Sequence, residues 1–501
     1  MGNIVIRMLM TKLAEHYSSK KTERFLVIFG IFYLLFGIVF YFGFNEIVFN
    51  PWLEWFMKLK PNGGMIMNIW QQSDSIINVW LFSIENGPKF LTGKQTIRLN
   101  EIGPFCFHSK HQRIIIDWPS NYQLIRFNES FHYEFDQESS IGPLSMMIKT
   151  INLPLLTILG NSHNNNSLLM DQNLTKRIED ELIIEKSVGQ ILGIDNHQNI
   201  TDDDDGGGGF SFFDHNKQYG PIELYTGQRY ARKLNQYYSY ENEHEFQYFQ
   251  HTTCNHFNQM NQGLFFGPKQ YDNLFVNIFD PRYACRSFRF LFDSNDQFDW
   301  IQTQYYRWDS KQFSLEYYPD NWCYCPDNND NDDDDCEGRF YLNRCYRQSD
   351  QQQQQWLVIT NVHFLHTKNL ARMVRGLRPD LLRHSSYLQM EPTFGVTVDS
   401  RFRLQYNFNL MQPFYQNLHP NVPHKPTVIP FLWIEEVYTV NGYLKMLLQF
   451  CSIFFIIISH FYTFIAAFGV CLIMIGVVRW LKKLIKNRMA VNDDDDNKDK
   501  S

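Results

Sequence analysis

The sequence lacks the short motifs that identify common enzyme classes. It has no G-x-S-x-G nucleophile elbow, no Walker-type glycine-rich loop and no H-E-x-x-H helix. It is also low in overall hydrophobicity, with a mean hydropathy of -0.36. We therefore expect no enzyme activity, no cofactor and no nucleic-acid partner, and any membrane-spanning segment must be local.

Two long apolar segments lie near the ends of the chain, at residues 25–44 and 446–478. A membrane-spanning helix needs about 20 predominantly apolar residues, and both segments are long enough. A cleaved signal peptide is the alternative for the first segment, but its apolar region is typically only about 7 to 15 residues long. The sequence therefore predicts two uncleaved transmembrane helices.

Basic residues flank both segments on the side nearer the chain ends. The outer flanks contain Arg7, Lys12, Lys20, Lys21, Arg24, Arg479, Lys482, Lys483, Lys486 and Arg488. The inner flanks contain only Lys58, Lys60 and Lys445. Because Lys and Arg remain on the cytosolic side, we predict cytosolic tails at 1–24 and 479–501 around an exoplasmic domain at 45–445.

Seven of the nine cysteines lie between the two apolar segments. They are Cys106, Cys254, Cys285, Cys323, Cys325, Cys336 and Cys345. Six of them cluster in residues 254–345, which is typical of a disulfide framework, and six cysteines allow 15 pairings. Zinc ligation is the alternative, but the spacing lacks the two C-x2-C to C-x4-C pairs of zinc sites, so we predict no metal. Cys106 is expected to be a buried free thiol.

Four sequons lie in the same part of the chain, and glycosylation enzymes of the exoplasmic side could modify them. Their asparagines are Asn128, Asn165, Asn173 and Asn199.

Short aromatic and β-branched runs dominate residues 66–141 and 210–436, which predicts a mainly β (α+β) domain. Between these blocks, Leu174, Ile178 and Leu182 recur at helical spacing, and we predict a helix over 174–192. Residues 144–159 are strongly apolar but too short to span a membrane. We expect this segment to pack against the predicted helix at 174–192 or to form an apolar docking surface.

Two histidine pairs, His108 with His111 and His363 with His366, have no third metal ligand at a recognisable spacing. We predict that these histidines have structural roles in strands.

Several motifs follow one another in an order that resembles the class B scavenger receptor family, over about residues 80–480. This family includes fatty-acid translocase, the high-density-lipoprotein receptor and a lysosomal integral membrane protein. The motifs are VWLFSIEN at 79–86, IGPF at 102–105, GLRP at 376–379, HSSYLQMEPTFG at 384–395 and VIPFLW at 428–433.

The resemblance implies a fold, a set of disulfides and a ligand site. The implied fold is an irregular β-barrel with an internal lipid tunnel and an apical helical bundle at about 144–192. The implied disulfides are Cys254–Cys323, Cys285–Cys345 and Cys325–Cys336. The implied apical ligand-binding residues are Lys149, Leu153, Leu155, Lys176 and Arg177. Acidic residues at 179–181 and 185 argue against binding of modified lipoproteins.

The resemblance also implies a receptor that binds lipids, fatty acids, sterols, lipoproteins or particle surfaces and moves lipid through the tunnel to the membrane. The alternatives are a lysosomal membrane receptor that sorts a hydrolase, which would bind a protein at the apical helices, and a two-span ion channel. Neither tail contains a cysteine or the acidic-dileucine signal of the lysosomal member. We therefore expect the plasma membrane, with the lysosomal membrane as the alternative.

Overall fold

The computed structural model describes residues 2–152, 155, 181–194, 213, 217–249, 252–257, 259–325, 336–345, 357–410 and 427–498. The chain divides into two compact units. One, the helical unit, combines Met1–Leu53 with Met446–Ser501. The other, the β unit, is Glu54–Lys445.

The helical unit contains α1 (Gly2–Gly43), a π-helical segment (Phe44–Phe49) and most of α13 (Gly442–Lys498). The two helices run antiparallel, because Gly30 faces Gly469 while Tyr41 faces Tyr462. A Cβ atom added to Gly30 would lie 2.7 Å from the Gly469 carbonyl oxygen, so the glycine allows close helix packing. Residues Thr22–Met57 and Gly442–Lys486 are long and apolar enough to cross a membrane, in agreement with the sequence prediction.

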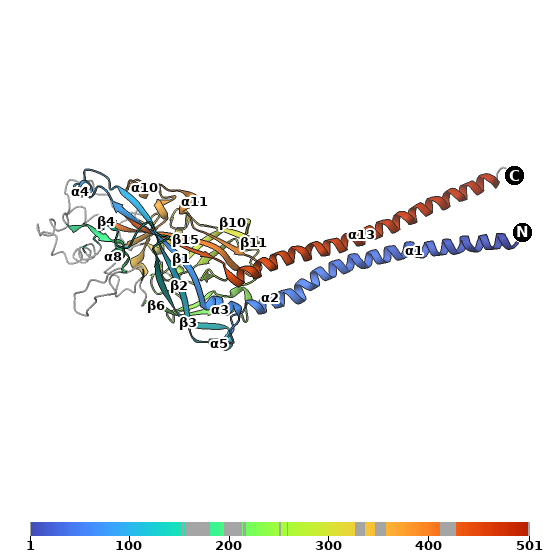
Figure 1. Ribbon diagram of the computed structural model, residues 1–501, viewed down its shortest axis with the longest axis horizontal. Coiled ribbons are helices and arrows are strands. Elements are labelled where there is room, and N and C mark those ends of the chain that lie inside the picture. The colour runs from blue at the N-terminus through green and yellow to red at the C-terminus, as the bar shows by residue number, and fades with distance from the viewer. Residues whose placement is uncertain are drawn as a thin grey trace. The chain divides into compact units, whose positions relative to one another are not determined.

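The β unit is built on one large sheet, with short helices in its connections (Figure 1). Its strands are β1 (Gln72–Ile84), β2 (Leu99–Asp117), β3 (Leu124–Asp136), β6 (Gln218–Tyr225), β7 (Tyr237–Tyr240), β8 (Met260–Asn261), β9 (Phe275–Ile278), β10 (Phe288–Phe298), β11 (Ile301–Trp308), β12 (Phe340–Tyr341), β13 (Leu357–Thr360), β14 (Tyr387–Glu391), β15 (Val396–Leu410) and β16 (Thr427–Thr439). A separate two-stranded sheet contains β4 (Met147–Ile151) and β5 (Ile183–Ser187).

Short helical segments precede β1 or lie in the connections between the strands. The α-helices are α2 (Asn50–Met57), α3 (Met65–Gln71), α4 (Gly87–Leu91), α5 (Pro119–Tyr122), α8 (Val188–Leu192), α9 (Thr252–Asn255), α10 (Lys368–Ala371) and α11 (Leu381–His384). The 3-10 segments are η3 (Ala231–Lys233), η4 (Pro319–Tyr324), η6 (Leu342–Cys345) and η8 (Val362–Phe364).

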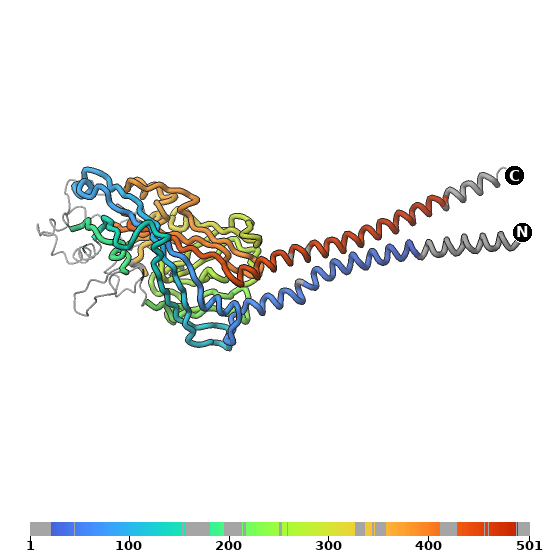
Figure 2. The backbone as a smooth tube through the Cα atoms, in the orientation of Figure 1, coloured from blue at the N-terminus to red at the C-terminus, as the bar shows by residue number. Residues whose placement is uncertain are grey.

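The large sheet closes into a barrel. Its strand order is β7-β6-β3-β2-β1-β16-β15-β14-β11-β10-β9-β8, and a bridge between Gln236 and Asn261 joins the two ends. Strand β1, near the start of the chain, pairs with β16, near its end, and the two run side by side in Figure 2. Closure leaves few strand edges exposed and creates an interior that side chains from many strands can line.

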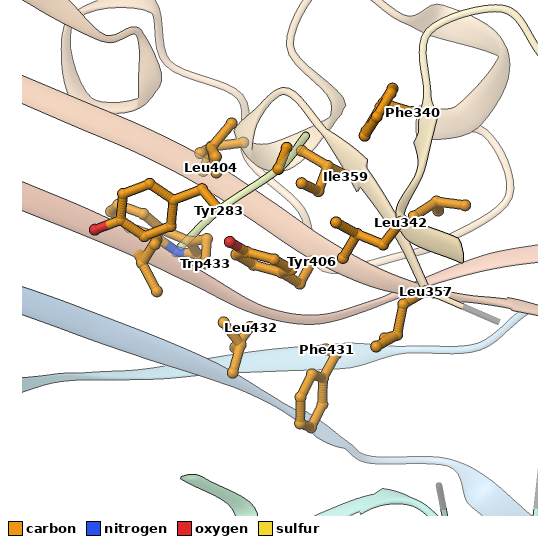
Figure 3. Packing of buried hydrophobic residues seen from close by; sticks show 14 of the residues in the cluster. Tyr283, Phe340, Leu342, Leu357, Ile359, Leu404, Tyr406, Phe431, Leu432 and Trp433 are labelled. Carbon is orange, nitrogen blue, oxygen red and sulfur yellow. The ribbon is translucent and has the colours of Figure 1, made fainter. Parts of the chain in front are cut away.

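A large apolar core fills one part of the barrel. Leu357 and Ile359 of β13 pack with Tyr406 of β15 and with Leu432 and Trp433 of β16 (Figure 3). The Trp433 ring also stacks on Trp80 of β1, with a centroid separation of 3.8 Å. Burying aliphatic and aromatic side chains contributes about 1.5 to 3 kcal/mol each, so this cluster is a main source of stability.

Three disulfide bonds join segments around this core. They are Cys254–Cys323, Cys285–Cys345 and Cys325–Cys336, the three pairs that the family resemblance implies. Cys106 lies in β2 as a buried free thiol, and burial raises its pKa.

The helices predicted at 144–159 and 174–192 are wrong for most of the described residues in these ranges. Residues Met147–Ile151 and Ile183–Ser187 are paired strands, whereas Leu155, Glu181 and the short helix Val188–Leu192 are helical. In β4 the side chains of Ile148 and Thr150 are buried, while those of Met147 and Lys149 are exposed. This alternation has the period of a strand, and the β-branched residues favour it.

Candidate functional site

The described part of the chain contains a partly open cavity inside the barrel. It contains about 880 Å³ of space between its atoms, including space open to solvent. Residues from β1, β2, β3, β7, β9, β10, β14, β15 and β16 line it. Closure of the barrel therefore brings together side chains from the beginning, middle and end of the β unit.

One wall of the cavity contains a buried ion cluster around Arg282. Its Nη2 atom lies 2.5 Å from Asp280 Oδ2 and 2.7 Å from Glu436 Oε2. The hydroxyl groups of Ser75 and Tyr283 each donate a hydrogen bond of 2.8 Å to Glu436. Burial alone would lower the pKa of Arg282, but Asp280 and Glu436 raise it well above its ordinary value. Arg282 therefore stays charged in the barrel wall.

A second polar cluster lies on the neighbouring strands β2 and β3. Glu129 Oε2 lies 2.9 Å from His111 Nε2 and accepts a 3.1 Å hydrogen bond from Gln262. Arg113 Nε lies 3.9 Å from the same oxygen, and burial lowers the pKa of Arg113 to about 10. Burial, with the charges of Arg113 and Arg282, lowers the pKa of His111 well below its ordinary range. The His111 ring is therefore neutral.

Apolar side chains complete the lining. They are Leu264, Ile278, Phe279, Phe290, Leu388 and Phe402. The acidic lining groups are Asp74, Glu129, Asp280 and Glu436, and burial raises the pKa of Glu129. The guanidinium groups in the lining are those of Arg113 and Arg282. A cavity with apolar walls and a polar side can hold an amphiphile, with its tail against the apolar walls and its polar group near the ion clusters.

Another polar cluster lies outside the cavity lining, near the stacked tryptophans. His363 Nε2 is 2.5 Å from Glu101 Oε2, and Arg383 lies 2.8 Å from the other Glu101 oxygen. The His384 ring stacks on the His363 ring with centroids 4.1 Å apart. His384 Nε2 is buried without a hydrogen-bond partner. The sequence did not predict this cluster, because Glu101 lies 262 residues before His363 in the chain.

The cluster has the spacing of a metal site, since ligand atoms of Glu101, His363 and His384 lie within 4.8 Å of one another. However, Nδ1 of His363 accepts the Arg378 backbone N–H, and Nδ1 of His384 accepts the Asp380 backbone N–H. A neutral imidazole with an accepting Nδ1 has its proton on Nε2, which then has no lone pair for a metal. These hydrogen bonds favour a proton-donating cluster over a metal site.

The predicted apical ligand residues fall partly within the described structure. Lys149 is exposed on β4 and stands opposite Glu185 of β5, a pairing of opposite charges. Leu155 is buried in the core rather than exposed for binding. Leu153, Lys176 and Arg177 lie outside the described residues.

The four sequons are distributed in a similar way. Asn128 lies half-buried in β3, and its Oδ1 atom is buried without a hydrogen-bond partner. Asn165, Asn173 and Asn199 lie outside the described residues.

Two cavity residues that were not predicted as a site, Glu129 and Glu436, could have been found from the pattern of buried residues in their strands. Glu129 alternates with Phe127 and Phe131, both buried, so the period of a strand places this carboxylate on an inward face. Glu436 likewise follows an apolar run in β16. A charge on the buried face of a strand needs a partner, and such a position is a candidate for function.

The chain is similar in sequence to several proteins over most of its length. It is 24% identical to sensory neuron membrane protein 2 of Heliothis virescens, covering 84% of this chain and 86% of that protein. It is 22% identical to scavenger receptor class B member 1 of Bos taurus, covering 77% and 75%. It is 23% identical to protein peste of Drosophila melanogaster, covering 78% and 72%. The model of the CD36 family matches residues 28–480, and this chain belongs to that family.

Proposed function

We propose that the chain is a cell-surface receptor that binds lipids or lipoproteins and moves lipid through the barrel cavity to the membrane. The cavity is the observation that carries this proposal, because it combines apolar walls with a polar side. The named similarity to a class B scavenger receptor supports it. Membership of the CD36 family argues against the two-span ion channel and against an enzyme.

The charges of the cavity refine the class of lipid. Arg282 is already engaged by Asp280 and Glu436, and carboxylates outnumber guanidinium groups in the lining. A fatty-acid anion would meet a surplus of negative charge, which is unfavourable at low dielectric. A neutral amphiphile such as a sterol, with a hydroxyl group that can hydrogen-bond to the polar side, fits this lining better.

Lipid transfer can be tested by filling the cavity. Ser400 lines it, whereas Ser294 of β10 is an exposed serine outside the lining. We expect Ser400→Trp to reduce uptake of fluorescent sterol from donor particles several-fold, and Ser294→Trp to leave it unchanged at matched surface expression. Unchanged uptake by Ser400→Trp would remove the cavity from the lipid path.

The membrane arrangement is also a proposal, with both termini in the cytosol and the β unit on the exoplasmic side. The antiparallel packing of α1 and α13 supports it, because two antiparallel spans place both chain ends on one side. Protease added to sealed cells should cut the β unit and spare epitope tags at both ends. A loss of mass on glycosidase treatment would independently show that the sequons are glycosylated and therefore lie on the exoplasmic side.

Ligand capture is proposed at residues 144–192, where Lys149 is exposed. Changing Lys149, Lys176 and Arg177 together to Glu should weaken particle binding and make the remaining binding less sensitive to salt. Lys149→Glu alone should have a smaller effect, because Glu185 already stands opposite this residue. Unchanged binding by the triple variant would place capture elsewhere on the chain.

We propose the plasma membrane as the location, and a tagged chain in its native cell tests this directly. Staining of intact cells by an antibody to the β unit is the expected result. Exclusive overlap with lysosomal markers would favour the alternative, a receptor that sorts a hydrolase.

A further inference from the structure

The hairpin formed by β10 and β11 ends in a strained and exposed tryptophan. Its two-residue loop is Asp299–Trp300, and both residues have positive φ, of 46° and 69°. Aspartate tolerates this conformation, but a bulky aromatic residue rarely adopts it. The Trp300 side chain is 70% exposed. Packing within the β unit therefore does not explain why an indole occupies this position.

An ion pair connects the loop to the start of α13. Asp299 Oδ2 lies 2.5 Å from Lys445 Nζ, and both residues belong to the β unit. Lys445 also lies over the Phe298 ring, the last residue of β10, at 5.9 Å. Lys445 is in the first turn of α13, and the candidate membrane-spanning segment of this helix is Gly442–Lys486. This ion pair holds the hairpin tip beside the first turn of α13.

Other exposed aromatic residues lie near the inner ends of the two candidate membrane-spanning segments, Thr22–Met57 and Gly442–Lys486. Tyr443, two residues before Lys445, is 78% exposed. Trp55, near the end of Thr22–Met57, is 59% exposed, and Lys60 Nζ lies 3.4 Å from its ring centroid. Tryptophan and tyrosine concentrate at membrane interfaces, where the ring meets lipid and its polar atom meets water.

We infer that Trp300 inserts into the headgroup region of the bilayer that α13 spans. The β10–β11 hairpin would then contact the membrane in addition to the two spanning segments. This inference rests on the proposed membrane arrangement. The occupant is the lipid interface itself, because the tip is tied to the first turn of the spanning helix. The backbone strain at Trp300 is then offset by burial of the indole in lipid, outside the protein.

Quenching by brominated lipid tests the inference on the full chain. The chain is reconstituted into phosphatidylcholine vesicles whose acyl chains are brominated near the headgroups, and tryptophan fluorescence is compared with that in unbrominated vesicles. Of the 11 tryptophans, Trp300 should contribute to the quenched fraction. We expect Trp300→Phe to reduce the lipid-dependent quenching, and Trp322→Phe, which removes another exposed indole, to leave it unchanged.

A second variant separates membrane contact from folding. Trp300→Gly removes the indole and suits the positive φ, so it should lower the quenching while raising the Tm of the β unit. Equal quenching of wild type and Trp300→Phe in inserted protein would overturn the inference. So would a change in cross-linked oligomers without a change in quenching, because the tip would then contact a second copy. If alkaline extraction releases the chain from the vesicles, this would instead contradict the membrane-spanning arrangement.

Discussion

Two of the basic groups that the β unit buries, Arg282 and His384, behave in opposite ways. Arg282 in the cavity wall lies between Asp280 and Glu436, and these carboxylates raise its pKa. His384 stacks on another histidine, its Nε2 has no partner, and burial lowers its pKa to about 4. Both groups have low exposure, so burial alone does not decide the charge. Partners of opposite charge decide it.

The comparison also shows what each cluster contributes. A buried ion pair is not a strong source of stability compared with an apolar core, but breaking it leaves a charge without a partner. A buried neutral histidine makes no charge interaction that could stabilise the fold at neutral pH. In acid, the unfolded chain takes up a proton that the folded chain does not, and this lowers the free energy of unfolding. The predictions below test this difference, from the largest expected effect to the smallest.

Removing the guanidinium group from the cavity wall should have the largest effect. Arg282→Met leaves the carboxylates of Asp280 and Glu436 buried without their cation, and we expect a loss of about 3 to 5 kcal/mol in the free energy of unfolding. Denaturant unfolding of the detergent-solubilised chain with intact disulfides measures it. A loss below about 1 kcal/mol would show that the cluster is hydrated and weakly coupled.

Acid should destabilise the β unit through His384. Its folded pKa of about 4 lies below the ordinary value of 6.5, so only the unfolded chain takes up the proton between these values. Stability is complete above about pH 6.5 and falls as the pH drops toward 4, by at most about 3 kcal/mol. The pKa of Glu101 is also lowered, because the hydrogen bond and charge of His363 and the charge of Arg383 outweigh burial, which adds a loss below its ordinary value of 4.5.

His384→Asn isolates the histidine contribution, because the Asn side-chain oxygen can still accept the Asp380 backbone N–H in place of Nδ1. The variant should unfold with a shallower pH dependence between pH 6.5 and 4 than the wild type. An unchanged pH profile would assign the acid sensitivity to other groups.

A single hydrogen bond in the cavity wall should have an intermediate effect. Tyr283→Phe removes the 2.8 Å hydrogen bond to Glu436 and leaves the ring packing intact. A hydrogen bond to a charged group contributes about 2 kcal/mol, and we expect a loss of this size in unfolding experiments. A double-mutant cycle with Glu436→Gln should recover most of this loss as coupling between the two residues.

An exposed ion pair should have the smallest effect. Arg307 and Asp293 lie 2.8 Å apart, but their side chains are 49% and 36% exposed. We expect Arg307→Met to cost less than about 1 kcal/mol, with a dependence on salt that Arg282→Met lacks. Equal losses for the two arginines would contradict the role of burial in this comparison.

The sequence alone predicted the main architecture, and the reasons are local. Long apolar runs indicate membrane-spanning segments, and short β-branched runs indicate strands, because both patterns depend on nearby residues. The six clustered cysteines indicated a disulfide framework, and family resemblance supplied their pairing. The prediction of helices failed at Met147–Ile151 and Ile183–Ser187, because the apolar pattern of a run of five residues is too short to distinguish a helix from a strand.

The chain's own sequence thus determined the class of fold, the two apolar segments and the set of cysteines. Only the tertiary structure decided which charges meet. Arg282 and Glu436 are 154 residues apart in the chain, and Glu101 and His363 are 262 apart. Periodicity tells which face of a strand a side chain occupies, but the register between strands and the closure of the barrel decide its partner. The cavity, the buried ion clusters and the tie between Asp299 and Lys445 all depend on that long-range packing.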